Sequence, residues 1–90
     1  MENHFTDPEF WNLFDALPLE LQTLAVKNYR LLRANPRHPS LHFKQVNSEL
    51  WSARVGIAHR ALAYKIEDGL RWFWIGSHDE YERLIRSSSD

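Results

Sequence analysis

The segment 50–81, LWSARVGIAHRALAYKIEDGLRWFWIGSHDEY, constrains the fold more than any other part of the chain. Its side chains alternate with a period of two, which is the period of a β-strand. Gly56 interrupts the alternation, and Glu67-Asp68-Gly69 is a hairpin sequence whose glycine we expect to adopt positive φ. Residues 70–75 are almost entirely apolar and predict an interior strand. The segment therefore predicts an antiparallel meander.

The period of two begins before this segment. Leu41 and Phe43 alternate with His42 and Lys44, so we expect a first strand to start at residue 41. In the next strand Trp51, Ala53 and Val55 face one way, whereas Ser52 and Arg54 face the other. Together with 59–66 and 70–75, these segments predict four strands.

Helical periodicity precedes the strands. A capping box formed by Thr6 and Glu9 predicts a first helix that ends at Leu17-Pro18. Pro18 opens a second helix, which Asn35-Pro36 stops. The same capping pattern at 77–80 predicts a short C-terminal helix, followed by a frayed tail at 87–90. Residues 3–5 are expected to form a short edge strand, although no local signal requires it.

These elements predict one α+β domain over residues 1–90. Two N-terminal helices pack on a twisted antiparallel sheet of about four strands, and a short helix follows. Ninety residues suffice for one core of two layers and are too few for a second domain.

Composition excludes several classes of protein. The chain has no cysteine, which excludes disulfides, thiolate metal sites and cysteine nucleophiles. Its acidic N-terminus does not resemble a secretory signal, and no segment approaches the ~20 apolar residues of a membrane span. We therefore expect a cytoplasmic protein without membrane contact. His38 and His42 are four apart, but Pro39 prevents a helix between them, so no metal and no cofactor is expected.

Charge is segregated along the chain. Residues 1–26 carry a net charge of −5, residues 27–65 carry +7, and the remainder carries −3, which gives −1 overall. A basic middle suits a polyanion or an acidic partner on one face. An ordinary solvated charged surface is the alternative.

Arg54 and Arg60 are the first candidate site residues. An unpaired arginine rarely faces a core, because a permanent charge is costly to desolvate. Two arginines beside a cleft hold a phosphate well and stabilise charge that develops during phosphoryl transfer. Alternatively, each pairs with a local carboxylate such as Glu49 or Asp79.

His78 and Tyr81 are the second pair, three residues apart at the start of the last helix. Histidine titrates near neutral pH and suits proton transfer, and a tyrosine hydroxyl can orient or exchange a proton. The alternative is a histidine near a helix cap and a tyrosine whose ring belongs to the core.

The chain resembles the RelE/ParE superfamily of bacterial type II toxins over nearly its whole length. The similar segments are the first helix from Phe10, the long second helix, LHFKQV at 41–46, WSARVGIAHRAL at 51–62 and WFWIGSHDEY at 72–81. The most specific part is the strand pair that reaches Arg60, then an apolar strand and Gly-x-His-x-x-Tyr.

The RelE branch of this superfamily implies a toxin that cleaves mRNA in the ribosomal decoding site by attack of a 2′-hydroxyl on the neighbouring phosphate. The resemblance implies that Arg60 stabilises the transition state and that Arg54 is one basic residue of the preceding strand. His78 falls near a second catalytic arginine of that branch. Tyr81 lies closer to that position than the RelE tyrosine does, and Ser52 stands where RelE has another basic residue.

Further contacts and partners follow from the same resemblance. We expect Arg37, Lys44, Trp51 and Ser52 to contact RNA. A cognate antitoxin is expected to wrap the toxin, with an acidic amphipathic segment over residues 27–65 and the apolar groove beside them. The ParE branch implies DNA gyrase as the target in place of the ribosome and mRNA, and an inactive member that only binds an antitoxin is a third possibility.

Overall fold

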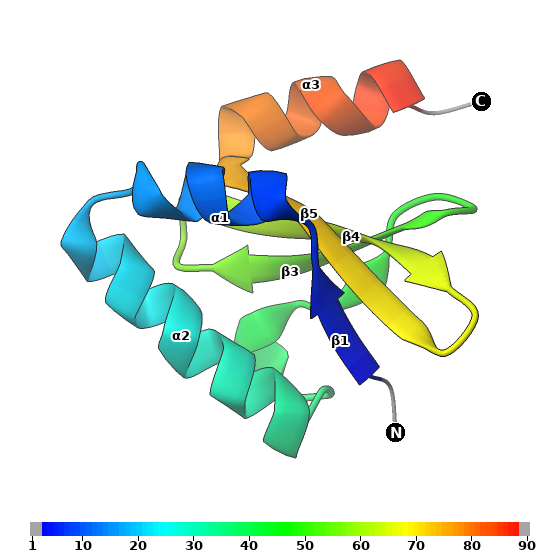
Figure 1. Ribbon diagram of the computed structural model, residues 1–90, viewed down its shortest axis with the longest axis horizontal. Coiled ribbons are helices and arrows are strands. Elements are labelled where there is room, and N and C mark those ends of the chain that lie inside the picture. Colours follow the sequence, from blue (N-terminus) through cyan, green and yellow to red (C-terminus); the bar gives the residue numbers. More distant parts are fainter. Residues whose placement is uncertain (1–2, 89–90) are drawn as a thin grey trace.

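The computed structural model describes residues 3–88 and contains three α-helices and five strands in that range (Figure 1). The elements in chain order are β1 (Asn3–Thr6), α1 (Pro8–Asp15), α2 (Leu19–Ala34), the 3-10 turn η1 (Pro39–Leu41), β2 (Lys44–Gln45), β3 (Leu50–Val55), β4 (His59–Ile66), β5 (Gly69–Ser77) and α3 (His78–Ser88). The predicted α+β class is confirmed.

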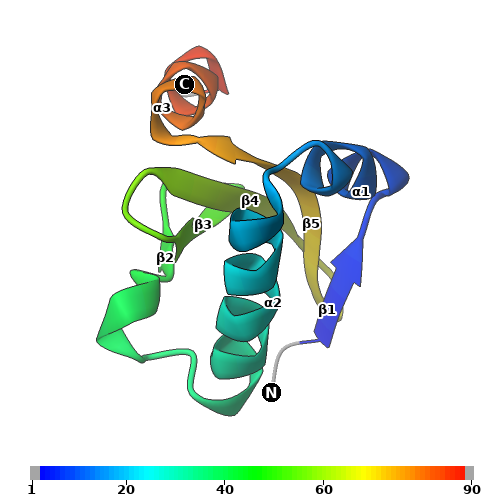
Figure 2. The same cartoon turned by 90° about the vertical axis from the view of Figure 1, so that its left-hand side faces the viewer.

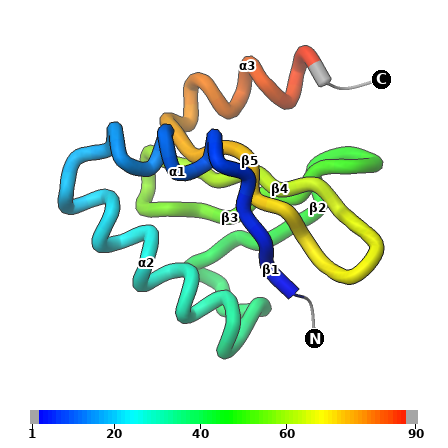
Figure 3. The backbone as a smooth tube through the Cα atoms, viewed as in Figure 1, coloured from blue at the N-terminus to red at the C-terminus, as the bar shows by residue number. Residues whose placement is uncertain are grey.

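The strands form a single sheet in the order β1-β5-β4-β3-β2. The meander from β2 to β5 is antiparallel, as predicted, and β5 is the interior strand that the run 70–75 indicated. The expected edge strand at 3–5 is present as β1, but it runs parallel to β5, so the sheet is mixed. Figure 3 shows this first strand of the chain lying beside the last one.

Helices cover both faces of the sheet (Figure 2). The α1 and α2 side carries the core, because alternate residues of β3 and β4 point there and pack against apolar residues of the two helices. Its buried members are Leu32, Leu41, Ala53, Val55, Ala61, Ala63, Leu70, Trp72 and Ile75. α3 crosses the other face, so the remaining residues of β3 and β4 lie beneath it or beside it. Within residues 3–88, no helix combines the length and apolar character that crossing a bilayer requires.

Two helix starts differ in their caps. The predicted Thr6 cap is wrong: Asp7 occupies the N-cap position without a side-chain cap bond, and the Thr6 hydroxyl accepts from Trp11 Nε1 at 2.9 Å instead. The Ser77–Glu80 pair forms, since the Glu80 amide donates to Ser77 Oγ at 3.3 Å. α3 continues through residue 88, so the tail predicted to fray from 87 is helical at its start, and 89–90 lie outside the described residues.

Backbone geometry corrects two further predictions. The strand predicted from residue 41 is wrong, because Leu41 closes η1 and His42 takes a left-handed conformation with φ of 44°. Gly69 does not have positive φ; Gly56 does, at 69°. Gly69 is needed for a different reason, since a Cβ there would lie 2.1 Å from the carbonyl oxygen of Asn3.

Candidate functional site

Arg54 and Arg60 lie directly opposite each other on β3 and β4. Opposed residues of an antiparallel pair project to the same face. That face is the one α3 crosses, because Ser52, two residues before Arg54, contacts α3. The fold therefore brings the two predicted arginines together at the end of the hairpin.

The Arg60 guanidinium braces the turn that joins its strand to β3. Its Nη1 donates to the carbonyl oxygens of His59 at 2.8 Å and of Gly56 and Ile57 at 3.4 Å each. Burial lowers the pKa of Arg60, and the neighbouring Arg54 charge lowers this pKa further, against the opposing influence of Tyr81 and Glu82. The site thus holds two like charges close together.

Neither arginine is neutralised by a carboxylate in contact with it. Among residues 3–88, no ion pair joins Arg54 or Arg60 to an acidic side chain, so the alternative of pairing with Glu49 or Asp79 is not observed. Arg54 Nε is buried and has no hydrogen-bond acceptor in the described part of the chain. Leaving such a donor unsatisfied costs about 1–3 kcal/mol, which an incoming anion can offset.

The His78 ring lies at the start of α3, where it contacts two residues of the same helix. Its Nε2 is 3.5 Å from Glu82 Oε2, and its ring centroid is 5.6 Å from that of Tyr81. The His78 and Glu82 side chains are each 41% exposed, so their contact is open to solvent. The His78 amide donates to the Ala58 carbonyl at 2.8 Å, which fixes the start of α3 against the β3–β4 turn.

Tyr81 is 4% exposed and belongs to the buried side of α3. Its hydroxyl donates to Ser52 Oγ at 3.4 Å, and Ser52 itself is 2% exposed. Exchange of a proton with a substrate would therefore require α3 to move. In this structure the Tyr81–Ser52 contact anchors the helix.

The four residues expected to contact RNA do not gather around the arginines. Lys44 is exposed and opposite Ser52 on the edge strand, so it lies on the arginine face. Ser52 is covered by α3, and Trp51 points to the other face, where it packs against Phe43 with ring centroids 5.0 Å apart. Arg37 lies in the turn after α2.

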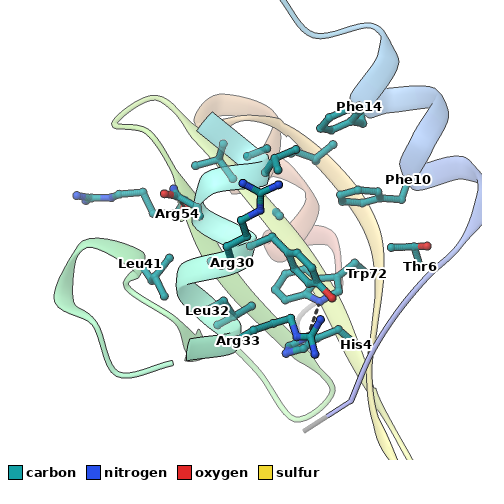
Figure 4. Close-up of a pocket in the computed structure, with 18 of the residues that line it drawn as sticks. His4, Thr6, Phe10, Phe14, Arg30, Leu32, Arg33, Leu41, Arg54 and Trp72 are labelled. Carbon is teal, nitrogen blue, oxygen red and sulfur yellow. Dashed lines mark hydrogen bonds between the residues drawn. The ribbon is translucent and has the colours of Figure 1, made fainter. Parts of the chain in front are cut away.

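Glu82 was missed by the sequence reasoning. The sequence contains a signal for Glu82, because residues four apart on a helix are neighbours and His78 precedes Glu82 by four. Sequence reasoning expected an apolar groove beside residues 27–65 but not its lining. The structure has a cavity of about 560 Å³ between α1, α2 and the sheet, including β1 (Figure 4). Its walls include Phe10, Phe14, Leu32, Leu41 and Trp72.

The cavity and the arginine pair are separate features. Arg54 borders both, but its guanidinium extends away from the cavity in Figure 4. Arg30 and Arg33 of α2 lie at the cavity instead. Inside it, Trp72 Nε1 donates to His4 Nδ1 at 3.0 Å.

No protein-family model matches this sequence, and no curated protein is a detectable relative. Solved structures are similar. YafQ from E. coli strain BL21(DE3) aligns with a TM-score of 0.70 and 12% identity over 90% of this chain and 98% of that one. A chain of the RelB-RelE antitoxin-toxin complex from Methanococcus jannaschii gives 0.68 and 10%, over 89% and 96%. The isolated E. coli RelE toxin gives 0.61 and 10%, over 97% and 98%.

These alignments cover 89–97% of this chain and 96–98% of the similar ones. The chain has the RelE/ParE-like toxin fold, which confirms the resemblance seen in the sequence.

Proposed function

We propose that this protein is the toxin of a type II toxin–antitoxin system and that it cleaves mRNA on the ribosome. The observation that carries the proposal is the pair of guanidinium groups of Arg54 and Arg60, which form no ion pair among residues 3–88 and lie next to an exposed His78–Glu82 pair on a sheet with this fold. Such a site attracts a phosphate and offers a group that can move a proton beside it. The proposed target places the protein in the cytoplasm.

In the proposed reaction the 2′-oxygen of a nucleotide attacks the adjacent phosphorus and the bond to the 5′-oxygen breaks. The 2′-hydroxyl loses its proton, the departing 5′-oxygen gains one, and a 2′,3′-cyclic phosphate remains. Arg54 and Arg60 hold the non-bridging oxygens and stabilise their growing charge. His78, oriented by Glu82, exchanges a proton with the reacting oxygens. Tyr81 keeps α3 in place.

Purified protein with ribosomes programmed with a defined message tests this proposal. Primer extension should show cleavage by the wild type and none by Arg60→Ala. Arg33→Ala removes one positive charge far from the hairpin end and is the matched control, which should cleave normally. Absence of any Arg60-dependent cleavage contradicts the enzyme proposal.

DNA gyrase is the second candidate target. It is favoured by Ser52, which is buried and leaves the arginine face with one cation fewer than the RelE branch implies. Inhibition of gyrase supercoiling by protein that leaves ribosome-bound message intact would identify this function.

The cavity of Figure 4 suits the antitoxin that we propose as partner. Its lining is largely apolar, Arg30 and Arg33 lie at it, and none of the described residues that line it is acidic. An acidic amphipathic segment complements such a surface. Two similar structures are RelB-RelE complexes, which supports an antitoxin as partner.

Binding to the cavity can be tested with the product of the neighbouring reading frame as the probe. Val26 lines the cavity and is 40% exposed, so Val26→Asp should weaken binding at least tenfold in calorimetry. Leu19 is 75% exposed and does not line the cavity, so Leu19→Asp is the control. Equal affinities of the two variants would place the antitoxin elsewhere.

A further inference from the structure

The turn between β3 and β4 presents an isoleucine to solvent. Ile57 is 86% exposed, more than any other large apolar side chain in the described residues. Its neighbours Gly56 and Ala58 are small, so the Ile57 side chain protrudes alone. The strands on either side carry Arg54 and Arg60, three residues before and three residues after it.

This turn is held firmly, unlike an ordinary surface loop. Arg60 Nη1 donates to the carbonyls of Gly56, Ile57 and His59, and the first amide of α3 donates to the carbonyl of Ala58. A Cβ on Gly56 would lie 2.9 Å from Leu24 Cδ2, so α2 packs closely against the turn from the other side. Ile57 is therefore displayed at a fixed place relative to the arginine pair.

The proposed cleavage requires a particular RNA geometry, which Arg54 and Arg60 alone do not impose. Attack by a 2′-oxygen requires this oxygen, the phosphorus and the 5′-oxygen to lie in line. A stacked RNA strand does not offer that geometry, and the bases on either side of the phosphate must be splayed apart. Proteins achieve such unstacking by inserting an apolar side chain between neighbouring bases.

We propose that Ile57 is this wedge, a positioning residue that enters the message between the two bases flanking the phosphate held by Arg54 and Arg60. The proposal rests on the proposed RNA cleavage. A single exposed apolar residue is common and by itself has no meaning. What distinguishes Ile57 is the hydrogen-bonded turn and its place between the two strands that carry Arg54 and Arg60.

A fluorescent message tests the wedge directly. The probe is a short mRNA on ribosomes, with 2-aminopurine placed in turn at each nucleotide of the occupied codon and a 2′-O-methyl group that blocks attack. Wild-type protein should raise the fluorescence at one position, because 2-aminopurine brightens when it leaves its stack. Ile57→Ala should bind with similar affinity and lose this rise, and its cleavage of unmodified message should slow about tenfold.

Two further variants separate the wedge from a general loss of apolar surface. Ile57→Leu should restore both the rise and the cleavage rate, whereas Leu19→Ala, at a leucine that is 75% exposed, should behave as the wild type. An equal rise with Ile57→Ala, or no rise with the wild type, overturns the wedge. Cleavage that depends on Arg60 but not on Ile57 overturns the wedge alone, while absence of any cleavage overturns the proposed function as well.

Discussion

The hydroxyl of Tyr81 donates a hydrogen bond to Oγ of Ser52 across 3.4 Å, in a contact where both residues are almost fully buried. This bond joins α3 to β3, two elements that the sequence separates by the whole of β4 and β5. It makes Tyr81 a structural anchor in this conformation. The role of its hydroxyl can therefore be separated by experiment from the role of its ring.

Tyr81→Phe removes the hydroxyl and keeps the ring. We expect it to lower the free energy of unfolding by about 0.5–1.5 kcal/mol, since a neutral hydrogen bond is lost, and to leave cleavage within a few-fold of wild type. Tyr81→Ala should cost about 3–5 kcal/mol, because it empties a buried site. Urea unfolding and primer extension measure the two effects. Loss of cleavage by Tyr81→Phe with unchanged stability would instead assign the hydroxyl to proton transfer.

Arg54→Met should separate stability from activity. Like charges opposite each other on two strands are unfavourable, and the Arg54 Nε is buried without an acceptor among the described residues. Removing this charge should therefore raise the unfolding free energy by up to about 1 kcal/mol, while cleavage falls at least tenfold. A variant that is both less stable and inactive would show that Arg54 has a structural role.

The burial of Arg60 and its repulsion by Arg54 together set the sign of the pH dependence of stability. Folding lowers the pKa of Arg60, chiefly through burial and then through Arg54, so the folded state holds the Arg60 proton less tightly than the unfolded state does. The resulting destabilisation is complete at neutral pH and is relieved only as the pH rises through the lowered pKa. Arg54→Met should reduce it, so its stabilising effect should shrink at strongly alkaline pH in unfolding experiments.

The sequence predicted the arginine pair because a strand period of two, broken once at Gly56, sets which residues face each other. The turn that follows this break is residues 56–58, and Arg54 and Arg60 lie three residues before and three residues after its middle residue, Ile57, so the antiparallel hairpin opposes them. For Tyr81 the sequence left two interpretations open, a proton-transfer residue and a core ring, and could not decide between them. Its burial depends on where α3 crosses the sheet, and helix periodicity gives the side of a helix without giving the surface it meets.

The parallel pairing of β1 was also beyond local reasoning. A four-residue strand carries little signal of its own, and its partner β5 lies more than sixty residues away along the chain. The absence of a Thr6 cap has a different cause, since the Thr6 hydroxyl is taken by Trp11 once α1 folds back beside the strand. The β1 pairing was decided by a contact far along the chain, whereas the Thr6 cap was lost to a competing side chain only five residues away.

Glu82→Gln tests the contact that we propose orients His78. Because the His78 and Glu82 side chains are each 41% exposed, the change should alter the unfolding free energy by less than about 0.5 kcal/mol. Cleavage should fall several-fold, and His78→Ala should reduce it further, at least a hundredfold, if the imidazole moves the proton. Single-turnover rates on programmed ribosomes measure this difference. Equal rates for Glu82→Gln and wild type would show that His78 acts without this partner.

Gly69→Ala should detach β1 while leaving the site intact. A methyl group there would lie 2.1 Å from the carbonyl oxygen of Asn3, a clash with backbone that no side-chain rotation relieves. We expect a loss of about 1–3 kcal/mol in unfolding free energy and loss of amide exchange protection in β1, with protection in β4 and most of β5 retained. Cleavage should persist, because the arginine pair and His78 lie toward the opposite end of β5, where Gly76 is opposite Arg60. Undiminished protection of β1 in Gly69→Ala would show that the strand tolerates displacement without leaving the sheet.

Gly56→Ala is the contrasting variant. It strains the turn between β3 and β4 through the φ of 69° at this residue and through its contact with Leu24, so it should impair cleavage while β1 stays protected from amide exchange.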